Sequence, residues 1–89
     1  MKFSQSCHFC GSRLFSQPIA GEAFRFTHGV GHRTIARTVE MTAVDQWAMT
    51  GLVLAAEVSS LFHPKEEWVD LRMPRYQVEI MHASLGKAL

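Results

Sequence analysis

The two cysteines of the chain lie three positions apart, at Cys7 and Cys10, and Gly11 follows directly. Downstream, His28 and His32 flank a Gly-Val-Gly segment. Cysteine thiolates and histidine nitrogens are ligands of zinc, and a structural zinc site takes four of them. We therefore predict a structural Zn²⁺ site whose ligands are Cys7, Cys10, His28 and His32. In its first half, Gly11 suits a turn position with positive φ.

The spacing Cys-x2-Cys-x17-His-x3-His covers residues 7–32. It resembles the spacing of two-cysteine, two-histidine zinc fingers and of zinc-ribbon knuckles. The resemblance implies a tetrahedral zinc ion that stabilises a small β element. The chain departs from the DNA-binding finger because its central gap is longer and its histidines flank glycines instead of lying on a helix. These departures argue against a helix that reads bases in the major groove.

Other histidines offer alternatives for the second half of the site. His8 lies inside the Cys7–Cys10 turn and is badly placed to bind the same ion. His63 and His82 are substitutes if His28 or His32 is not a ligand. Otherwise His63 is a cation at a helix C-terminus and His82 is an ordinary strand residue.

A redox dithiol is the alternative interpretation of the cysteine pair. That motif belongs at the start of a helix that follows a buried strand. Here Gly-Ser-Arg follows Cys10, and Pro18 is near. Neither feature favours a helix, so metal binding is the preferred hypothesis.

The first part of the chain, residues 1–41, is predicted to be a zinc-ribbon-like β unit. Weak alternation and β-branched residues favour strands there over helices. We expect a short strand at 1–6, a loop at 12–21 with a brief return strand at 13–15, and strands at 22–27 and 33–42 that pair as a hairpin across the turn at 28–32.

The clearest element is a central helix within 42–63, covering about 43–62. Thr42 is a good N-cap with Asp45 three residues later, a version of the capping box, and Pro64 ends the helix. Apolar residues recur at three- and four-residue steps, as an amphipathic helix requires. This stripe comprises Val44, Trp47, Ala48, Gly51, Ala55, Val58 and Phe62, widened by Met49, Leu52 and Ala56.

Residues 64–83 are predicted to form a C-terminal β-hairpin that packs on the helix. Its strands are Trp68–Arg72 and Tyr76–His82, joined by a turn at 73–75. The tail at 84–89 is expected to fray. The chain is thus predicted to be one α+β domain over residues 1–89, stapled by zinc at its N-terminal end.

Composition narrows the class of protein. Of the 89 residues, 47% are hydrophobic and 19% are charged, which is typical of a folded globular protein. The net charge of +1 argues against a strongly basic nucleic-acid clamp. No signal peptide is visible, and charges inside the most apolar window, 44–62, argue against a membrane helix. We expect a soluble, cytoplasmic protein.

No motif for nucleophilic, acid–base or phosphate chemistry appears, so we predict no enzymatic activity. The expected function is zinc-stabilised protein–protein interaction, as an adaptor or an inhibitor of a larger complex, with self-association through the helix as a further option. Nucleic-acid binding by the Arg-rich N-terminal ribbon is the second hypothesis, and a small zinc or thiol enzyme is the third. The candidate partner-binding residues are Arg13, Arg25, Arg33, Arg37, Trp47, Trp68 and Tyr76.

Overall fold

The computed structural model describes residues 3–29, 40–66 and 68–86. Within these ranges the chain forms a four-stranded antiparallel sheet and two helices, which confirms the predicted α+β class. The strands lie in the sheet in the order β1-β2-β3-β4. The elements are β1 (Phe3–Ser6), β2 (Arg13–Pro18), β3 (Ala23–Gly29), α1 (Ala43–Phe62), β4 (Trp68–Pro74) and α2 (Arg75–Leu85).

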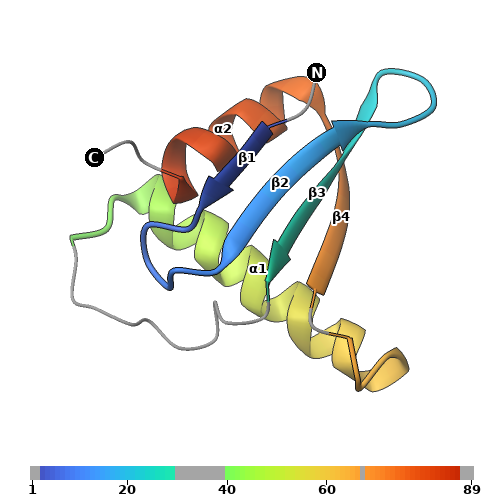
Figure 1. Cartoon of the computed structure of the whole chain (residues 1–89). Helices are drawn as coiled ribbons and strands as arrows, with labels where there is room; N and C mark the ends of the chain where they lie inside the picture. The colour runs from blue at the N-terminus through green and yellow to red at the C-terminus, as the bar shows by residue number, and fades with distance from the viewer. Residues whose placement is uncertain (1–2, 30–39, 67, 87–89) are drawn as a thin grey trace.

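Both helices lie on the same face of the sheet (Figure 1). The sheet alternates accordingly, since successive side chains of a strand point to opposite faces. The helix-facing side is buried and includes Leu14, Ser16, Phe24, Phe26, His28, Val69 and Met73. The other side carries Arg13, Phe15, Arg25, Thr27, Trp68, Asp70 and Arg72. No described helix covers this second side, which we call the open face.

Helix α1 confirms the predicted central helix, including its capping box. The Thr42 hydroxyl accepts a hydrogen bond from the Asp45 N–H at 3.1 Å, and the Asp45 carboxylate accepts one from the Thr42 N–H at 2.9 Å. Asp45 is 2% exposed, and its other oxygen accepts from the Ser84 hydroxyl at 2.7 Å. The start of α1 is therefore fixed to the end of α2. The last residue of α1, Phe62, is followed by His63 as C-cap.

The predicted apolar stripe of α1 has an unexpected orientation. The helix buries Ala48, Met49, Leu52 and Ala56 against the sheet and α2. Of the predicted stripe, Ala48 and the three residues that widen it are buried, whereas Val44, Trp47, Val58 and Phe62 from its centre are exposed. The helix is apolar on two sides, and the sheet covers the side with the smaller residues.

The predicted C-terminal hairpin is wrong in its second half. β4 confirms the first strand and extends it to Pro74, but Tyr76–His82 is part of α2, together with Ser84 and Leu85 of the predicted tail. Val78, Met81, His82 and Leu85 are buried, and their spacing is that of one helix face. Pro74 is the N-cap, and an Arg75–Glu79 contact of 3.3 Å joins adjacent turns.

The predicted N-terminal ribbon also needs correction. β2 continues through Pro18, so much of the expected loop at 12–21 is strand. β3 has β2 on one edge and β4 on the other, which leaves no edge for the predicted strand at 33–42. Residues 33–39 of that strand lie outside the described ranges, and residues 40–42 are not in a strand. β4 joins the N-terminal strands in one sheet, so the strands that the structure describes do not form a separate ribbon unit.

Candidate metal centre

The two cysteines lie in the tight turn that joins β1 to β2. The Cys7 N–H donates to the Ser12 carbonyl at 2.7 Å, and the Gly11 N–H donates to the Cys7 carbonyl at 2.9 Å. Gly11 has φ 77°, a backbone conformation that side chains with a Cβ rarely adopt. The predicted role of this glycine is confirmed. The turn holds the two sulfur atoms within 4.8 Å of each other.

Burial and backbone amides act in opposite directions on the first thiol. Cys7 is 1% exposed, and Cys10 is half-buried; neither forms a disulfide. Burial raises the pKa of Cys7 to about 11, while hydrogen bonds from the Cys10 and Phe9 backbone partly offset that rise. A raised pKa is the opposite of what activates a nucleophilic thiol. A bound cation would instead displace the proton of the Cys7 thiol, and the backbone amides would help to stabilise the thiolate that binds the cation.

His28 reaches the same point from the sheet. It lies near the end of β3, opposite Leu14 on β2 and Val69 on β4, and it is fully buried. Its Nδ1 lies 2.6 Å from the Gly29 carbonyl oxygen, so Nδ1 carries the proton and Nε2 carries the lone pair. A hydrogen bond from one ring nitrogen to a carbonyl is the usual support of a histidine that binds metal through the other.

Together these three side chains form a cluster that could hold a metal ion. One ligand atom from each of Cys7, Cys10 and His28 lies within 4.8 Å of the others. The fold thus brings three of the four predicted ligands together, although His28 is far from the two cysteines in sequence. The fourth, His32, lies outside the described residues and stays a prediction. In the sequence, His32 follows His28 by only four positions.

The alternative histidines lie elsewhere. Within the described ranges the cluster contains neither His8, His63 nor His82. The His8 ring contacts the edge of Phe9, with 5.2 Å between ring centroids. His63 is exposed at the C-cap of α1, the predicted place for a cation near a helix end. His82 lies on α2, so its predicted strand position is wrong.

His82 belongs to a buried polar network that the sequence did not predict. Its Nε2 lies 3.0 Å from the Ser16 hydroxyl, and its Nδ1 lies against the Gln5 side-chain oxygen. Gln5 in turn donates to the Gly86 carbonyl at 3.0 Å. Burial lowers the pKa of His82, which suits a neutral imidazole that accepts from Ser16 and donates to Gln5.

Ser16 and His82 resemble a nucleophile and its base, but their position inside the core gives the pair a structural role. Ser16 is completely buried, so no substrate can reach its hydroxyl. The network instead joins α2 to β1 and β2. Ser16 and His82 are 66 residues apart in sequence, and nothing in a linear pattern links them.

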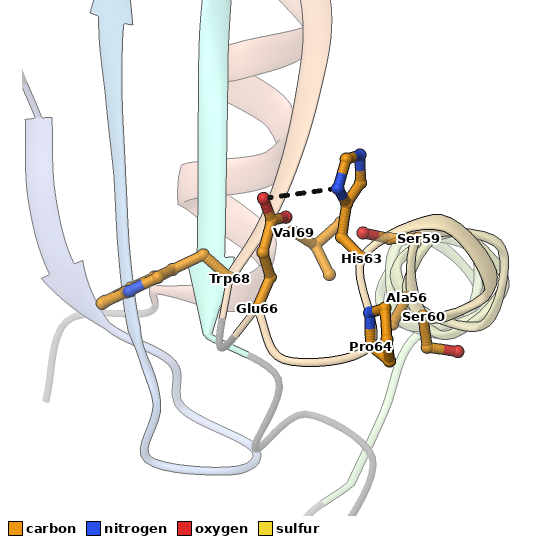
Figure 2. Close-up of a pocket in the computed structure, with 8 residues that line it drawn as sticks. All are labelled: Ala56, Ser59, Ser60, His63, Pro64, Glu66, Trp68 and Val69. Atoms are coloured by element: carbon orange, nitrogen blue, oxygen red, sulfur yellow. Dashed lines mark ion pairs between the residues drawn. The ribbon is translucent and has the colours of Figure 1, made fainter.

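Polar side chains also line a cavity near the C-terminal end of α1 (Figure 2). Its volume is about 150 Å³, and Ser59, Ser60, His63 and Glu66 are among its lining residues. His63 Nδ1 lies 3.9 Å from Glu66, and both side chains are more than half exposed. The Ser60 hydroxyl donates to the Glu57 carbonyl of its own helix at 2.8 Å. The His63 backbone N–H donates to the Ser59 carbonyl at 2.7 Å, but in the described part of the chain no hydrogen bond joins the His63 ring to either serine hydroxyl. The geometry therefore gives no support for an activated serine here.

The predicted partner-binding residues are spread over different surfaces. Arg13, Arg25 and Trp68 lie on the open face of the sheet, Trp47 lies on the exposed side of α1, and Tyr76 is exposed at the start of α2. Arg33 and Arg37 lie outside the described residues. The prediction missed Arg72, which lies directly opposite Arg25. The alternation of 68–72 places Arg72 on the same side as Trp68.

The fold and the cluster define a small α+β protein with a two-cysteine, one-histidine group able to hold a metal ion. No protein family, curated protein or solved structure matches the chain in comparisons of all three kinds. Among the described helices, neither has the length and apolar character needed to cross a membrane.

Proposed function

We propose that the chain is a non-catalytic, zinc-stabilised binding protein that holds a protein partner on the exposed side of α1. As an adaptor it would join this partner to another protein, and as an inhibitor it would block the partner's own contacts. The binding surface, here called the outward face of α1, comprises Val44, Trp47, Leu54, Val58, Leu61 and Phe62.

The outward face is the observation that carries the proposal. Its six side chains are between 49% and 80% exposed, and they recur at the spacing of one helix face. Of the two charged residues in α1, Asp45 is buried and Glu57 is exposed. A contiguous apolar patch of this kind marks an interaction surface. Each large apolar side chain that a partner covers contributes about 1.5–3 kcal/mol.

The N-terminal half of this face has a wide, open hollow that a helical partner could enter. Trp47, Thr50, Gly51 and Leu54 are among the residues that line this hollow, whose volume is about 460 Å³. A Cβ built on Gly51 would meet no atom within 4 Å, so a partner's side chain can approach the helix backbone there. The chemistry fits an amphipathic helix whose apolar residues pack into this hollow.

Zinc is the metal that the donor set favours. Two thiolates and one imidazole match its structural sites, with a fourth ligand to complete the tetrahedron. Zn–S bonds of about 2.3 Å at tetrahedral angles separate two sulfur atoms by about 3.8 Å, so a cluster already within 4.8 Å needs only a small contraction. Burial of Cys7 and His28 supports a structural role, because a substrate could not reach an ion between them. The predicted fourth ligand is His32.

Site-specific photocrosslinking in the native host tests the proposed surface. A crosslinking amino acid at Leu61, which is 80% exposed, should give a discrete adduct with one protein. The same amino acid at Ala20, which is exposed in the turn between β2 and β3, is the control. Leu54→Glu should abolish the Leu61 adduct without unfolding the chain, because Leu54 is 57% exposed. Equal adducts at both positions, or an adduct insensitive to Leu54→Glu, would refute the proposal.

A further inference from the structure

The open face of the sheet concentrates positive charge at one end. Arg25 on β3 lies directly opposite Arg72 on β4, and both are exposed. Like charges directly opposite across a strand pair destabilise a sheet. In the described part of the chain, neither guanidinium forms an ion pair with a carboxylate. A bound anion between them would remove this repulsion.

The other end of the open face carries an aromatic pair. The rings of Phe15 and Trp68 meet edge to face, with 5.8 Å between centroids. Trp68 reaches Phe15 across β3 because its partner on that strand is Gly29, which has no side chain. Trp68 is 40% exposed, so part of the indole is available for stacking.

The acidic residue between these two ends is already engaged. Asp70 accepts a hydrogen bond from the Thr27 hydroxyl at 2.6 Å, next to the arginine pair along both strands. On β2, toward the aromatic end of the face, exposed Arg13 donates to the Ser4 hydroxyl at 2.6 Å and adds a third positive charge. The open face therefore combines three guanidinium groups and two aromatic rings with one tethered carboxylate.

We propose that the open face binds single-stranded nucleic acid, with phosphates on Arg25 and Arg72 and a base on Trp68. Positive charge that follows the backbone and aromatic rings on which bases stack are the two components of such sites. Four residues of β3 separate the two ends, which is about 14 Å along an extended strand. A single strand can span that length and turn an unpaired base onto the indole, whereas the bases of a duplex are already stacked.

Fluorescence anisotropy with labelled ten-nucleotide oligo(U) and oligo(dT) tests this proposal on the full chain. We expect binding at 50 mM salt that weakens by about 7- to 18-fold at 200 mM, since two to three phosphate contacts give a logarithmic salt slope of about −1.4 to −2.1. Arg72→Gln should reduce that slope by about 0.7. Trp68→Ala should weaken binding by about 5- to 150-fold at an unchanged slope.

Controls separate this site from general attraction to polyanions. Arg75→Gln removes the same charge from α2, which lies on the other side of the sheet, and should leave the affinity unchanged. Arg25→Gln provides a second test at an exposed position where the substitution leaves the core intact. No binding at 50 mM salt, equal binding of polyglutamate, equal binding of a duplex, or equal loss in Arg75→Gln would overturn the proposal. Outward-face variants of α1 should bind the oligonucleotide normally, so this test stands apart from that of the protein partner.

Discussion

Replacement of His82 by leucine should destabilise the chain far more than its position on a surface helix suggests. The histidine donates to Gln5 and accepts from Ser16, and the Ser16 hydroxyl is completely buried. Leucine retains an apolar volume close to that of the imidazole but removes both hydrogen bonds. The variant therefore isolates the polar network from the cost of a cavity.

The magnitude follows from the two groups that lose a partner. A hydrogen bond to half-buried Gln5 contributes about 1 kcal/mol, and a buried hydroxyl left without its partner costs about 1–3 kcal/mol. The expected loss is thus about 2–4 kcal/mol, against a total stability of roughly 4–13 kcal/mol for 89 residues. In a domain of this size each kcal/mol lowers the melting temperature by about 4–8 °C.

Urea unfolding of the wild type, His82→Leu, Ser16→Ala and the double variant measures this loss. Because the side chains are in contact, the two single changes should be coupled by about 0.5–3 kcal/mol. A loss below about 1 kcal/mol in His82→Leu would contradict the reasoning from unsatisfied buried groups. Additive single variants would show that Ser16 and His82 do not act together.

The remaining predictions concern the metal, acid and the first helix. The purified chain should contain about one zinc ion, and Cys7→Ser or Cys10→Ser should lower both the zinc content and the melting temperature; unchanged values in metal analysis and thermal melts would contradict the site. The free energy of unfolding should fall as the pH drops below 6.5 toward the lowered pKa of His82, because the unfolded chain takes up the proton first. Urea unfolding at several pH values, after removal of metal with a chelator, should show this dependence on pH, and His82→Leu should reduce it. Thr42→Ala should lower the free energy of unfolding, measured with urea, by about 0.5–2 kcal/mol. An unchanged free energy would show that the capping box of Thr42 and Asp45 does not stabilise the chain.

The features that the sequence predicted correctly are those set by local chemistry. The cysteine turn depends on Cys7, Cys10 and a glycine with positive φ, all within five residues. α1 extends over 20 residues between an N-cap at Thr42 and a proline at 64, so its periodicity is unambiguous. His28 could be proposed as a ligand because histidine near a cysteine pair is chemically distinctive. The turn and the helix are each defined by one segment, and His28 can be proposed from its residue type alone.

The failures arise where distant segments decide the outcome. Over the seven residues from Tyr76 to His82, apolar residues alternate and also fit one helix face. Contact with the sheet and α1 settles the choice, because only a helix buries Val78, Met81 and Leu85 together. The same limit explains the error in the orientation of α1. The helix has two apolar sides, and its sequence does not show which of them packs against the sheet. The hydrogen bond between Ser16 and His82 could likewise not be predicted, because the two residues are 66 positions apart in the sequence.

The position of the metal cluster explains how one small fold can present two separate surfaces. At the end of the sheet near the Cys7–Cys10 turn, Phe9, Leu14 and Leu85 of α2 belong to one buried cluster. A metal ion there would tie the β1–β2 turn to β3 and would add to the packing of that corner against α2. α1 is then free to lie along β4 with its outward face exposed, while Trp68 and Phe15 lie over Gly29, next to His28. Loss of the ion should therefore disturb the open face before the outward face of α1, since α1 is fixed separately through Asp45 and Ser84.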